Sequence, residues 1–211
     1  MRAFPSVCLA TCVALLPACA TADPSTNQAT SLVEQRSGLT ANVASKLWDW
    51  AEVGYQETKS SGLLQDTLAG EGFDVEAGVA GIPTAFVAEY GSGEPVIAIL
   101  AEFDALPGIN QSSAPTRDPV EGKHAGQACG HNLFGAGSVS AAIAVRHWLE
   151  STGTEGTIRV YGTPAEEGGS GKVYMTRAGL FDDVDIAMHW HPDDQNSAAA
   201  NTSLANRSAK H

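Results

Sequence analysis

The chain has 211 residues, of which 43% are hydrophobic and 17% are charged, and this balance is typical of a folded globular domain. It excludes a chain that is disordered or fibrous over most of its length. Asp and Glu outnumber Lys and Arg by 24 to 12, which gives a net charge of −12 and argues against a general nucleic-acid-binding surface.

Residues 1–20 have the three-part layout of a bacterial secretory signal, with Arg2 near the start and an uncharged, mostly apolar run behind it. That run is too short and too interrupted by proline to span a membrane. We therefore predict a signal peptide over residues 1–22 and an exported, periplasmic protein. Two cleavage alternatives remain open. The letters LPAC resemble a lipoprotein box, which would lipidate Cys19 and anchor the protein in a membrane, such as the outer membrane; ACA and ATA fit an ordinary signal-peptidase site.

Three of the four cysteines belong to this predicted leader, which leaves Cys129 as the only cysteine of the folded body. It has no partner for a disulfide within the mature chain. An unpaired thiol in an oxidising compartment is either buried as a small apolar side chain or has a role such as metal ligation, and both interpretations stay open at this point.

Residues 23–37 are polar and contain few large apolar side chains, so we predict a flexible tether there. Behind it, apolar residues at helical spacing indicate one helix after an N-cap at Thr40 and a second helix over about 59–68. Strands and helices then alternate: strands at 73–79, 84–90 and 95–103, a helix at 131–149, a strand at 157–163, a short helix at 171–178 and a strand at 185–191.

This alternation predicts the fold class, an α/β domain over residues 38–196 with a mixed, mostly parallel sheet and helices on both of its faces. The run VIAILAEF is apolar enough for a central strand that is buried on both faces. In such open sheets, ligands gather at the carboxyl ends of the strands. The residues that follow each strand are therefore the first place to look for a site.

Side chains that can bind a metal follow the predicted strands. Thiolate, imidazole and carboxylate groups that converge at strand ends are the ligands of a transition-metal site. They are Asp104 after the apolar strand, Cys129 and His131 before the long helix, Glu166 and Glu167 after the next strand, and His189 and His191 at the end of the last strand.

The spacing within these groups suggests roles. Gly130 separates Cys129 from His131 and lets both side chains turn toward one point. Glu166 and Glu167 are adjacent in a loop, where one carboxylate can bind a metal while the other stays free as a base for metal-activated water. The alternatives are a solvated acidic loop, structural histidines and an aspartate that caps a helix or turn.

Four motifs together resemble a known family: AEFDALPG, ACGHNLFGAG, GTPAEEGGSGKVYMTRAGLFDDVD and HWHP. From about Leu39 to its end, the chain is similar to metal-dependent amidohydrolases related to the auxin-conjugate and hippurate hydrolases, subfamily D of peptidase family M20. The resemblance implies a zinc-peptidase-like catalytic domain that holds two divalent metal ions. A thiolate and imidazoles favour zinc as the metal, and carboxylates allow manganese.

The resemblance also implies a role for each candidate residue. The choice of His191 over His189 as a ligand rests on its spacing from Asp185. Carried over by position, the metal ligands are Cys129, which bridges the two ions, His131, Glu167 and His191; the general base is Glu166; and the residues that support the ligands from behind are Asp104 and His189.

The implied reaction is hydrolysis of an amide bond in an N-acyl or N-aroyl amino acid or a dipeptide-like substrate, by metal-activated water whose proton Glu166 takes and returns. The implied partners are this small-molecule amide and, for full-length members, a second copy in a homodimer, which we do not expect of the present chain. No nucleic-acid partner is expected. The alternatives are an inactive truncated fragment, a non-catalytic metal-binding periplasmic protein, and a remnant that does not fold because its sheet keeps unpaired edges.

Two features depart from the family pattern. Gln127 stands where members usually have a histidine two residues before the cysteine, so we expect an altered hydrogen bond or proton relay near the thiolate. The chain stops at His211, so residues 197–211 would only begin the lid and dimerisation domain and the catalytic domain would be incomplete. A lid histidine, a late histidine ligand and contacts to a substrate carboxylate would lie in the missing part, and His211 is not expected to replace them.

Overall fold

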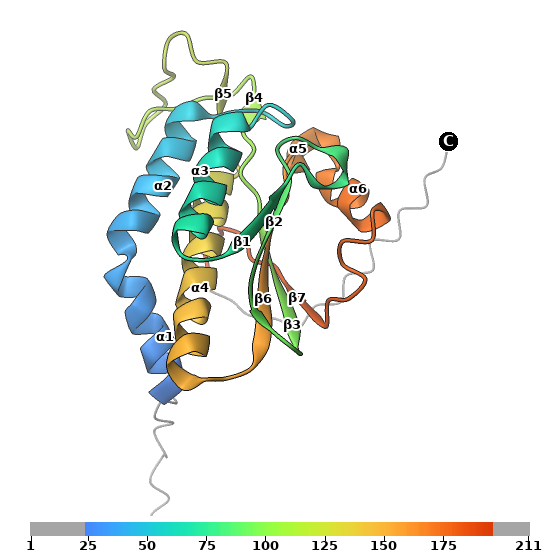
Figure 1. Ribbon diagram of the computed structural model, residues 1–211. Coiled ribbons are helices and arrows are strands. Elements are labelled where there is room, and N and C mark those ends of the chain that lie inside the picture. The colour runs from blue at the N-terminus through green and yellow to red at the C-terminus, as the bar shows by residue number, and fades with distance from the viewer. Residues whose placement is uncertain (1–23, 196–211) are drawn as a thin grey trace, which may run out of the picture.

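The secondary structure of the computed structural model, which describes residues 24–195, follows the expected order, apart from a helix at its start and a few additional short elements (Figure 1). The predicted signal peptide with Cys19 and the predicted start of the lid domain with His211 lie outside these residues. The helices are α1 (Pro24–Gln35), α2 (Ser37–Trp50), α3 (Thr58–Gly70), α4 (His131–Thr152), α5 (Glu166–Gly169) and α6 (Gly171–Arg177). The strands are β1 (Asp74–Ala77), β2 (Phe86–Ser92), β3 (Val96–Ala101), β4 (Leu106–Pro107), β5 (Ala125–Gly126), β6 (Gly156–Gly162) and β7 (Ile186–Met188).

In the described part of the chain, five strands form one mixed sheet in the order β1–β2–β6–β3–β7, and β4 pairs separately with β5. β2 is antiparallel to both β1 and β6, whereas β3 is parallel to both β6 and β7. Ile99 in β3 lies between Val160 of β6 and Met188 of β7, so the apolar run forms an interior strand as predicted. The carboxyl ends of β6, β3 and β7 therefore meet at one edge of the sheet.

Apolar side chains pack on both faces of the sheet, which confirms the predicted fold class of an α/β domain with helices on both faces (Figure 1). Burial of each such side chain contributes about 1.5–3 kcal/mol relative to leaving it exposed, so the two cores fix the strand ends in place. The larger core lies between the sheet and helices α2, α3 and α4 and includes Leu47, Leu64, Phe86, Phe103 and Ile143; the smaller one lies on the other face, near α6, and includes Val79, Ile82, Tyr161 and Met175.

The prediction of a flexible tether over residues 23–37 is wrong for the part that the structure describes, because α1 is a helix that packs against α4. Ala29 and Leu32 of this helix are partly buried, as is Arg36 directly after it, and their spacing makes a narrow helical stripe. Gln28 also donates a hydrogen bond from Nε2 to Oγ of Ser151 in α4, at 2.9 Å. The predicted N-cap at Thr40 is wrong too, since α2 already begins at Ser37.

The long helix α4 packs closely against the end of β3 and thereby places its first residue, His131, at the carboxyl edge of the sheet. A Cβ atom at Gly135 would lie 2.8 Å from the carbonyl oxygen of Glu102, so this close approach requires glycine. Ser138 in the same helix donates from Oγ to the carbonyl of Leu100, at 2.7 Å. Across residues 24–195, no helix is both long enough and apolar enough to cross a membrane.

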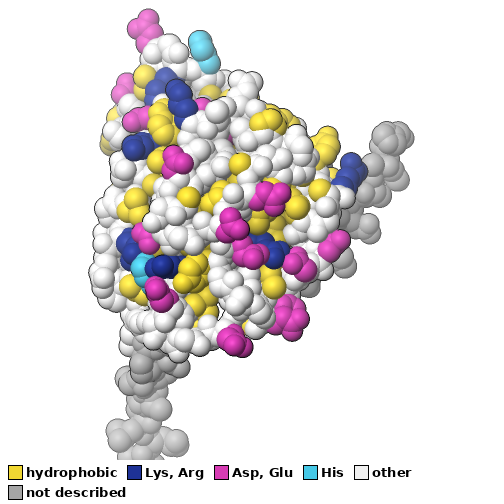
Figure 2. Space-filling model, viewed as in Figure 1, with side chains coloured by type: hydrophobic (Ala, Val, Ile, Leu, Met, Phe, Trp, Pro, Cys, Tyr) yellow, Lys and Arg dark blue, Asp and Glu magenta, His cyan; other side chains and the backbone are white. Residues whose placement is uncertain are grey.

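Acidic side chains gather on the face of the molecule seen in Figure 2, over the region of β1 and β2, around a basic group. In this region the guanidinium of Arg159 lies 2.6 Å from Glu89 and 2.8 Å from Asp183. Asp74, Glu76 and Asp182 line the same surface. The paired Arg159 leaves this face predominantly negative, in keeping with the net charge of −12.

Candidate metal centre

The candidate ligands come from four segments that meet at the carboxyl edge of β6, β3 and β7. β3 leads into Glu102 and Asp104, the loop before α4 carries Cys129, α4 begins with His131, β6 leads into Glu166 and Glu167, and β7 leads into His189 and His191. Two groups bring potential ligand atoms within 4.8 Å of one another: Cys129, His131 and His191 form one, and Glu102, His131 and Glu166 form the other. His131 belongs to both groups and is therefore the centre of the arrangement.

His131 is fully buried, and both of its ring nitrogens face carboxylates. Nδ1 lies 2.9 Å from Oδ1 of Asp104, and Nε2 lies 3.0 Å from Oε2 of Glu102. Burial disfavours the charged ring, but the hydrogen bonds and charges of Asp104 and Glu102 outweigh this effect and raise the pKa of His131 to about 10. The surroundings of this histidine therefore favour a positive charge.

The buried polar atoms around His131 fit a bound cation. Nε2 of His131 and Oε1 of Glu167 are both buried without a hydrogen bond of good geometry, and such atoms are rare in folded proteins. Oε1 of Glu167 lies 3.9 Å from Nδ1 of His131. Because Asp104 holds Nδ1, Nε2 is the nitrogen that would bind a metal once the cation displaces its proton, in the way that carboxylates orient ligating histidines.

Cys129 lies next to His191, with 3.4 Å between Sγ and Nε2. The rings of His191 and His131 meet edge to face, with 5.6 Å between their centroids. Burial, together with the neighbouring Glu167 carboxylate, raises the pKa of Cys129 to about 11, so the thiol keeps its proton at neutral pH. A divalent cation would have to displace that proton for Cys129 to act as a ligand.

The two adjacent glutamates of α5 have different surroundings. Glu167 is half-buried, and its backbone N–H donates to Oδ2 of Asp104 at 3.0 Å, whereas Glu166 is exposed. Ala165, just before them, has a left-handed backbone with φ 57° and ψ 42°. Both carboxylates nevertheless reach the centre: Oε1 of Glu167 lies 3.9 Å from Nδ1 of His131, and a carboxylate oxygen of Glu166 lies within 4.8 Å of potential ligand atoms of His131 and Glu102.

Glu102, which the sequence patterns did not identify, is almost fully buried at the end of β3. Its Oε1 accepts from Lys172 of α6 and lies 3.2 Å from Nε2 of His189. Burial acts to raise the pKa of Glu102, but His131, His189 and Lys172 together hold it well below its usual range. The structure thus places His189 against Glu102, and His191 against Cys129. The spacing of Glu102 and Asp104, two residues apart at a strand end, is the signal that could have identified it.

Gln127, the departure from the family pattern, is buried and bridges two elements of the site. Its Nε2 donates to the carbonyl of Phe103 after β3, at 3.3 Å, and its Oε1 accepts the backbone N–H of Asn132 in the first turn of α4, at 3.0 Å. Gln127 therefore holds the start of α4 against the end of β3. The segment between Gln127 and Asn132 carries Cys129.

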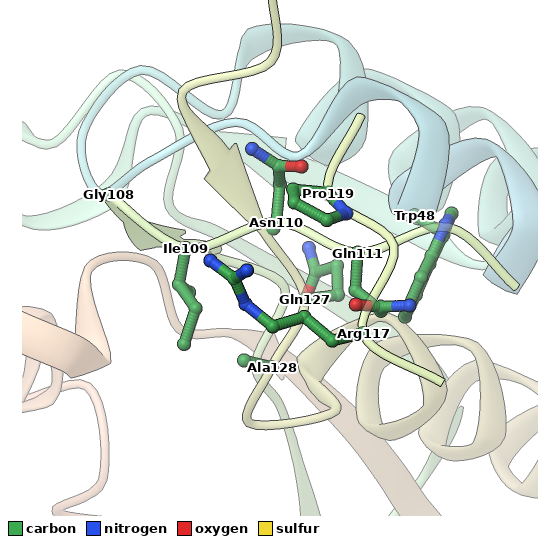
Figure 3. A pocket seen from close by; sticks show the side chains of 10 residues that line it. Trp48, Gly108, Ile109, Asn110, Gln111, Arg117, Pro119, Gln127 and Ala128 are labelled. Atoms are coloured by element: carbon green, nitrogen blue, oxygen red, sulfur yellow. The ribbon is translucent and has the colours of Figure 1, made fainter. Parts of the chain in front are cut away.

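Two cavities lie beside these residues. One of about 320 Å³ is lined by Asp104 and Glu167 together with Tyr55, Gly54 and Ala165. A second, of about 400 Å³, is lined by residues that include Gln127, Ala128, Trp48, Asn110 and Arg117 (Figure 3). Figure 3 shows the side chain of Arg117 lying across this second cavity toward Ile109. The first cavity thus borders the candidate centre directly, whereas the second is lined by Ala128, the residue before Cys129.

Comparisons with known proteins identify relatives of this chain. The chain is 47% identical over 154 residues to one of the subunits of p-aminobenzoyl-glutamate hydrolase from Escherichia coli (strain K12), an alignment that covers 72% of this chain and 32% of that protein. Among solved structures, a putative aminohydrolase from methicillin-resistant Staphylococcus aureus superposes with a TM-score of 0.65 at 25% identity, covering 78% of this chain and 42% of that one. A dinuclear metal-binding peptidase of the M20 family from Bacillus subtilis superposes with a TM-score of 0.60 at 25% identity, covering 78% and 44%.

The chain spans about a third of the length of the curated relatives that it matches. The family model of Peptidase family M20/M25/M40 matches residues 98–203, which include every segment of the candidate centre. The resemblance predicted from the four sequence motifs is thereby confirmed. With its fold, its strand-end residues and this match in agreement, the chain belongs to Peptidase family M20/M25/M40.

Proposed function

We propose that the protein hydrolyses an amide bond in a metal-dependent reaction. The observation that carries this proposal is the state of His131, which is fully buried, held at Nδ1 by Asp104 and faced at Nε2 by the carboxylate of Glu102, 3.0 Å away but without a hydrogen bond of good geometry. A histidine that a carboxylate orients in this way is a common metal ligand. Membership of a peptidase family supports the same chemistry.

The residues that would hold two divalent ions, zinc or manganese, are Cys129, His131, Glu167 and His191. Their mixture of thiolate, imidazole and carboxylate suits either metal, and the related peptidase from Bacillus subtilis is described as dinuclear. When bound, the ions would polarise the amide carbonyl and lower the pKa of water. Glu102 adds a further carboxylate to the same centre, 3.0 Å from His131.

In this proposal the protein's own side chains position groups and move the proton. The exposed carboxylate of Glu166 takes a proton from the attacking water and returns it to the leaving amine. Asp104 fixes the ring of His131 through Oδ1 and the backbone of Glu167 through Oδ2, so one buried carboxylate aligns two candidate ligands. Lys172 and His189 surround Glu102 and offset its negative charge.

The substrate that we infer is a small N-acyl or N-aroyl amino acid or a dipeptide-like amide. The name of the 47% identical relative supports an aroyl amino acid, and the description of that relative as one subunit of an enzyme supports an assembly with other subunits. We also propose export to the periplasm through the predicted signal peptide at residues 1–22, with membrane anchoring if Cys19 is lipidated. A homodimer is proposed only for longer family members.

The test measures metal per chain by elemental analysis and the release of p-aminobenzoate from p-aminobenzoyl-glutamate. We compare the wild type with Glu166→Gln and with the exposed control Glu155→Gln. Glu166→Gln should keep its metal and lose turnover, while the control keeps both. Full activity in Glu166→Gln would remove this residue as the base. A wild-type chain without metal overturns the proposal, and one that binds metal without turnover supports the non-catalytic metal-binding alternative instead.

A further inference from the structure

The connection between α2 and α3, residues 51–57, lies against both turns that carry the acidic residues of the candidate centre. Val53 forms a parallel bridge with Ala105, and the backbone N–H of Ala105 donates to the carbonyl of Glu52 at 2.9 Å. These contacts fix the residue after Asp104. This connection comes before the first strand of the sheet in the chain, and it lies far in sequence from the motifs that identify the centre.

The same connection holds the turn before Glu166 and Glu167. Oε1 of Glu57 accepts the backbone N–H of Ala165 at 2.8 Å, and the Tyr55 hydroxyl donates to the carbonyl of Gly169 at 2.5 Å. Gly54 packs so closely that a Cβ there would lie 2.9 Å from Cβ of Ala165. The two ends of α5 are thus both fastened to one short segment.

Glu57 itself is fully buried, which is unusual for a carboxylate. Its Oε2 accepts from the hydroxyl of Thr84 at 2.9 Å, and among residues 24–195 no cation forms an ion pair with it. Burial raises the pKa of Glu57 despite its hydrogen bonds. Burial of such a group is costly, so its place in the fold calls for a specific role.

The backbone of Ala165 supplies that role. Its left-handed φ of 57° is unfavourable for an alanine, and its fully buried N–H needs an acceptor. Glu57 is that acceptor, and without it the chain could relax out of the left-handed conformation. Because Glu166 and Glu167 follow directly, a change in this backbone would redirect both carboxylates.

We propose that Glu57 is a positioning residue, which fixes the Ala165 turn through its carboxylate oxygen and so directs both Glu166 and Glu167 toward the metal centre. The inference rests on the proposed function, because that function gives Glu166 and Glu167 their roles as base and ligand. The anchoring of the Ala165 turn by Glu57 does not depend on bound metal.

The test compares Glu57→Ala, which removes the acceptor, with Glu57→Gln, whose amide oxygen can still accept from Ala165 and whose amide nitrogen can donate to Thr84. The control is Glu71→Ala at the far end of α3, where the half-buried carboxylate pairs with Arg36 and His147. Two quantities are measured on the full chain: hydrogen exchange of the amides at 165–169 in the metal-free protein, and the Kd for zinc by chelator competition.

Glu57→Ala should speed exchange at 165–169 and raise the zinc Kd by about tenfold each, which is the scale for one buried hydrogen bond. Glu57→Gln and Glu71→Ala should both stay within about twofold of the wild type. In a Glu167→Ala background, Glu57→Ala should no longer change the zinc Kd, because the ligand that it positions is gone. A structural role alone would instead give additive effects in this cycle.

Three results would each overturn the inference. They are wild-type exchange in a folded Glu57→Ala protein, effects of Glu57→Gln on exchange and zinc Kd as large as those of Glu57→Ala, and additive effects of Glu57→Ala and Glu167→Ala on the zinc Kd. If Glu57→Ala does not fold, Thr84→Val replaces it as the test variant, because it removes only the hydrogen bond that orients the Glu57 carboxylate. Thr84→Val should speed exchange at 165–169 by about threefold. Unchanged exchange in Thr84→Val would overturn the inference. A wild type that binds no zinc refutes the proposed function, while the exchange data still test the anchor.

Discussion

Replacement of Asp104 by asparagine removes one negative charge from the candidate metal centre and keeps the shape of the side chain. In the wild type, Oδ1 of Asp104 accepts from Nδ1 of His131 at 2.9 Å and Oδ2 accepts the N–H of Glu167 at 3.0 Å. The contact with His131 is buried, the contact with the Glu167 backbone is partly buried, and Asp104 itself is 1% exposed. In Asp104→Asn, the amide oxygen can keep only one of the two bonds, and the amide nitrogen then faces a second donor.

The size of the effect follows from these two contacts. A hydrogen bond to a charged group contributes about 1.5–3 kcal/mol and a neutral one about 0.5–1.5 kcal/mol, so the bond to His131 weakens by about 1–1.5 kcal/mol. The unsatisfied N–H of Glu167 adds about 1–3 kcal/mol. Part of this cost falls on the metal-free protein as well. We therefore expect the Kd for zinc to rise by about 10-fold to 100-fold, the range for the loss of a carboxylate that orients a ligating histidine.

The assay is chelator competition with zinc, run beside Asp118→Asn, an exposed aspartate whose Oδ2 accepts from Ser112. The control should bind zinc as the wild type does. An NMR titration of the His131 ring in the metal-free protein gives a second measurement, since its pKa of about 10 should fall when Asp104 loses its charge. An unchanged zinc Kd together with an unchanged His131 pKa would refute the reasoning.

Three further predictions concern the thiol, the pH dependence of stability and the core. Cys129→Ser should lower the metal content of the protein. In the metal-free wild type, the alkylation rate of Cys129 should rise only as pH approaches about 11, as measured by mass spectrometry of its peptide. Rapid alkylation near neutral pH would contradict the raised pKa of Cys129. The folded-state pKa of His131, about 10, lies above its unfolded value of about 6.5. The stability that His131 contributes is therefore fully present below about pH 6.5 and is lost as pH rises through about 10. Urea unfolding of the metal-free protein at increasing pH should show this loss, and His131→Gln should flatten that part of the stability–pH curve. Leu64→Ala, at a fully buried position of the larger core, should lower the free energy of unfolding by about 2–5 kcal/mol, whereas Leu133→Ala, at a position that is 50% exposed, should change it by at most about 0.5 kcal/mol.

The sheet and most of the helices could be predicted because their signals are local. The apolar run of β3, the β-rich run of β6 and the long helix α4 all appear where the hydrophobic pattern places them. α1 was missed because its buried stripe is narrow, with Ala29 and Leu32 as its partly buried apolar residues, so its helical form depends on packing against α4. The pairing of β4 with β5 involves two residues on each side, too few for a periodic pattern.

The candidate site was predictable in its residue types and less so in its contacts. Cys129, His131 and the two glutamates stand at strand or helix ends, where a sequence pattern can find them. Glu102 was missed because it directly follows the apolar residues of β3, and the sequence pattern does not distinguish it from the last residue of that strand. Its burial becomes acceptable only through Lys172 of α6 and His189 after β7, partners 70 and 87 residues away in the chain. Such a partnership depends on the order of strands in the sheet, which local patterns do not contain.

The place of β6 between β2 and β3 has a consequence for how the protein folds. β2 and β3 follow one another directly in the chain, yet each uses β6 as its neighbour, through pairs such as Glu89 with Arg159, which are 70 residues apart. A hairpin between β2 and β3 would occupy the gap that β6 must enter. The two strands therefore have to keep facing edges open until the chain through Gly162 has been made. Long-range closure of this kind slows folding and exposes strand edges to other chains, so a slow, concentration-sensitive refolding reaction is the kinetic cost of this sheet order.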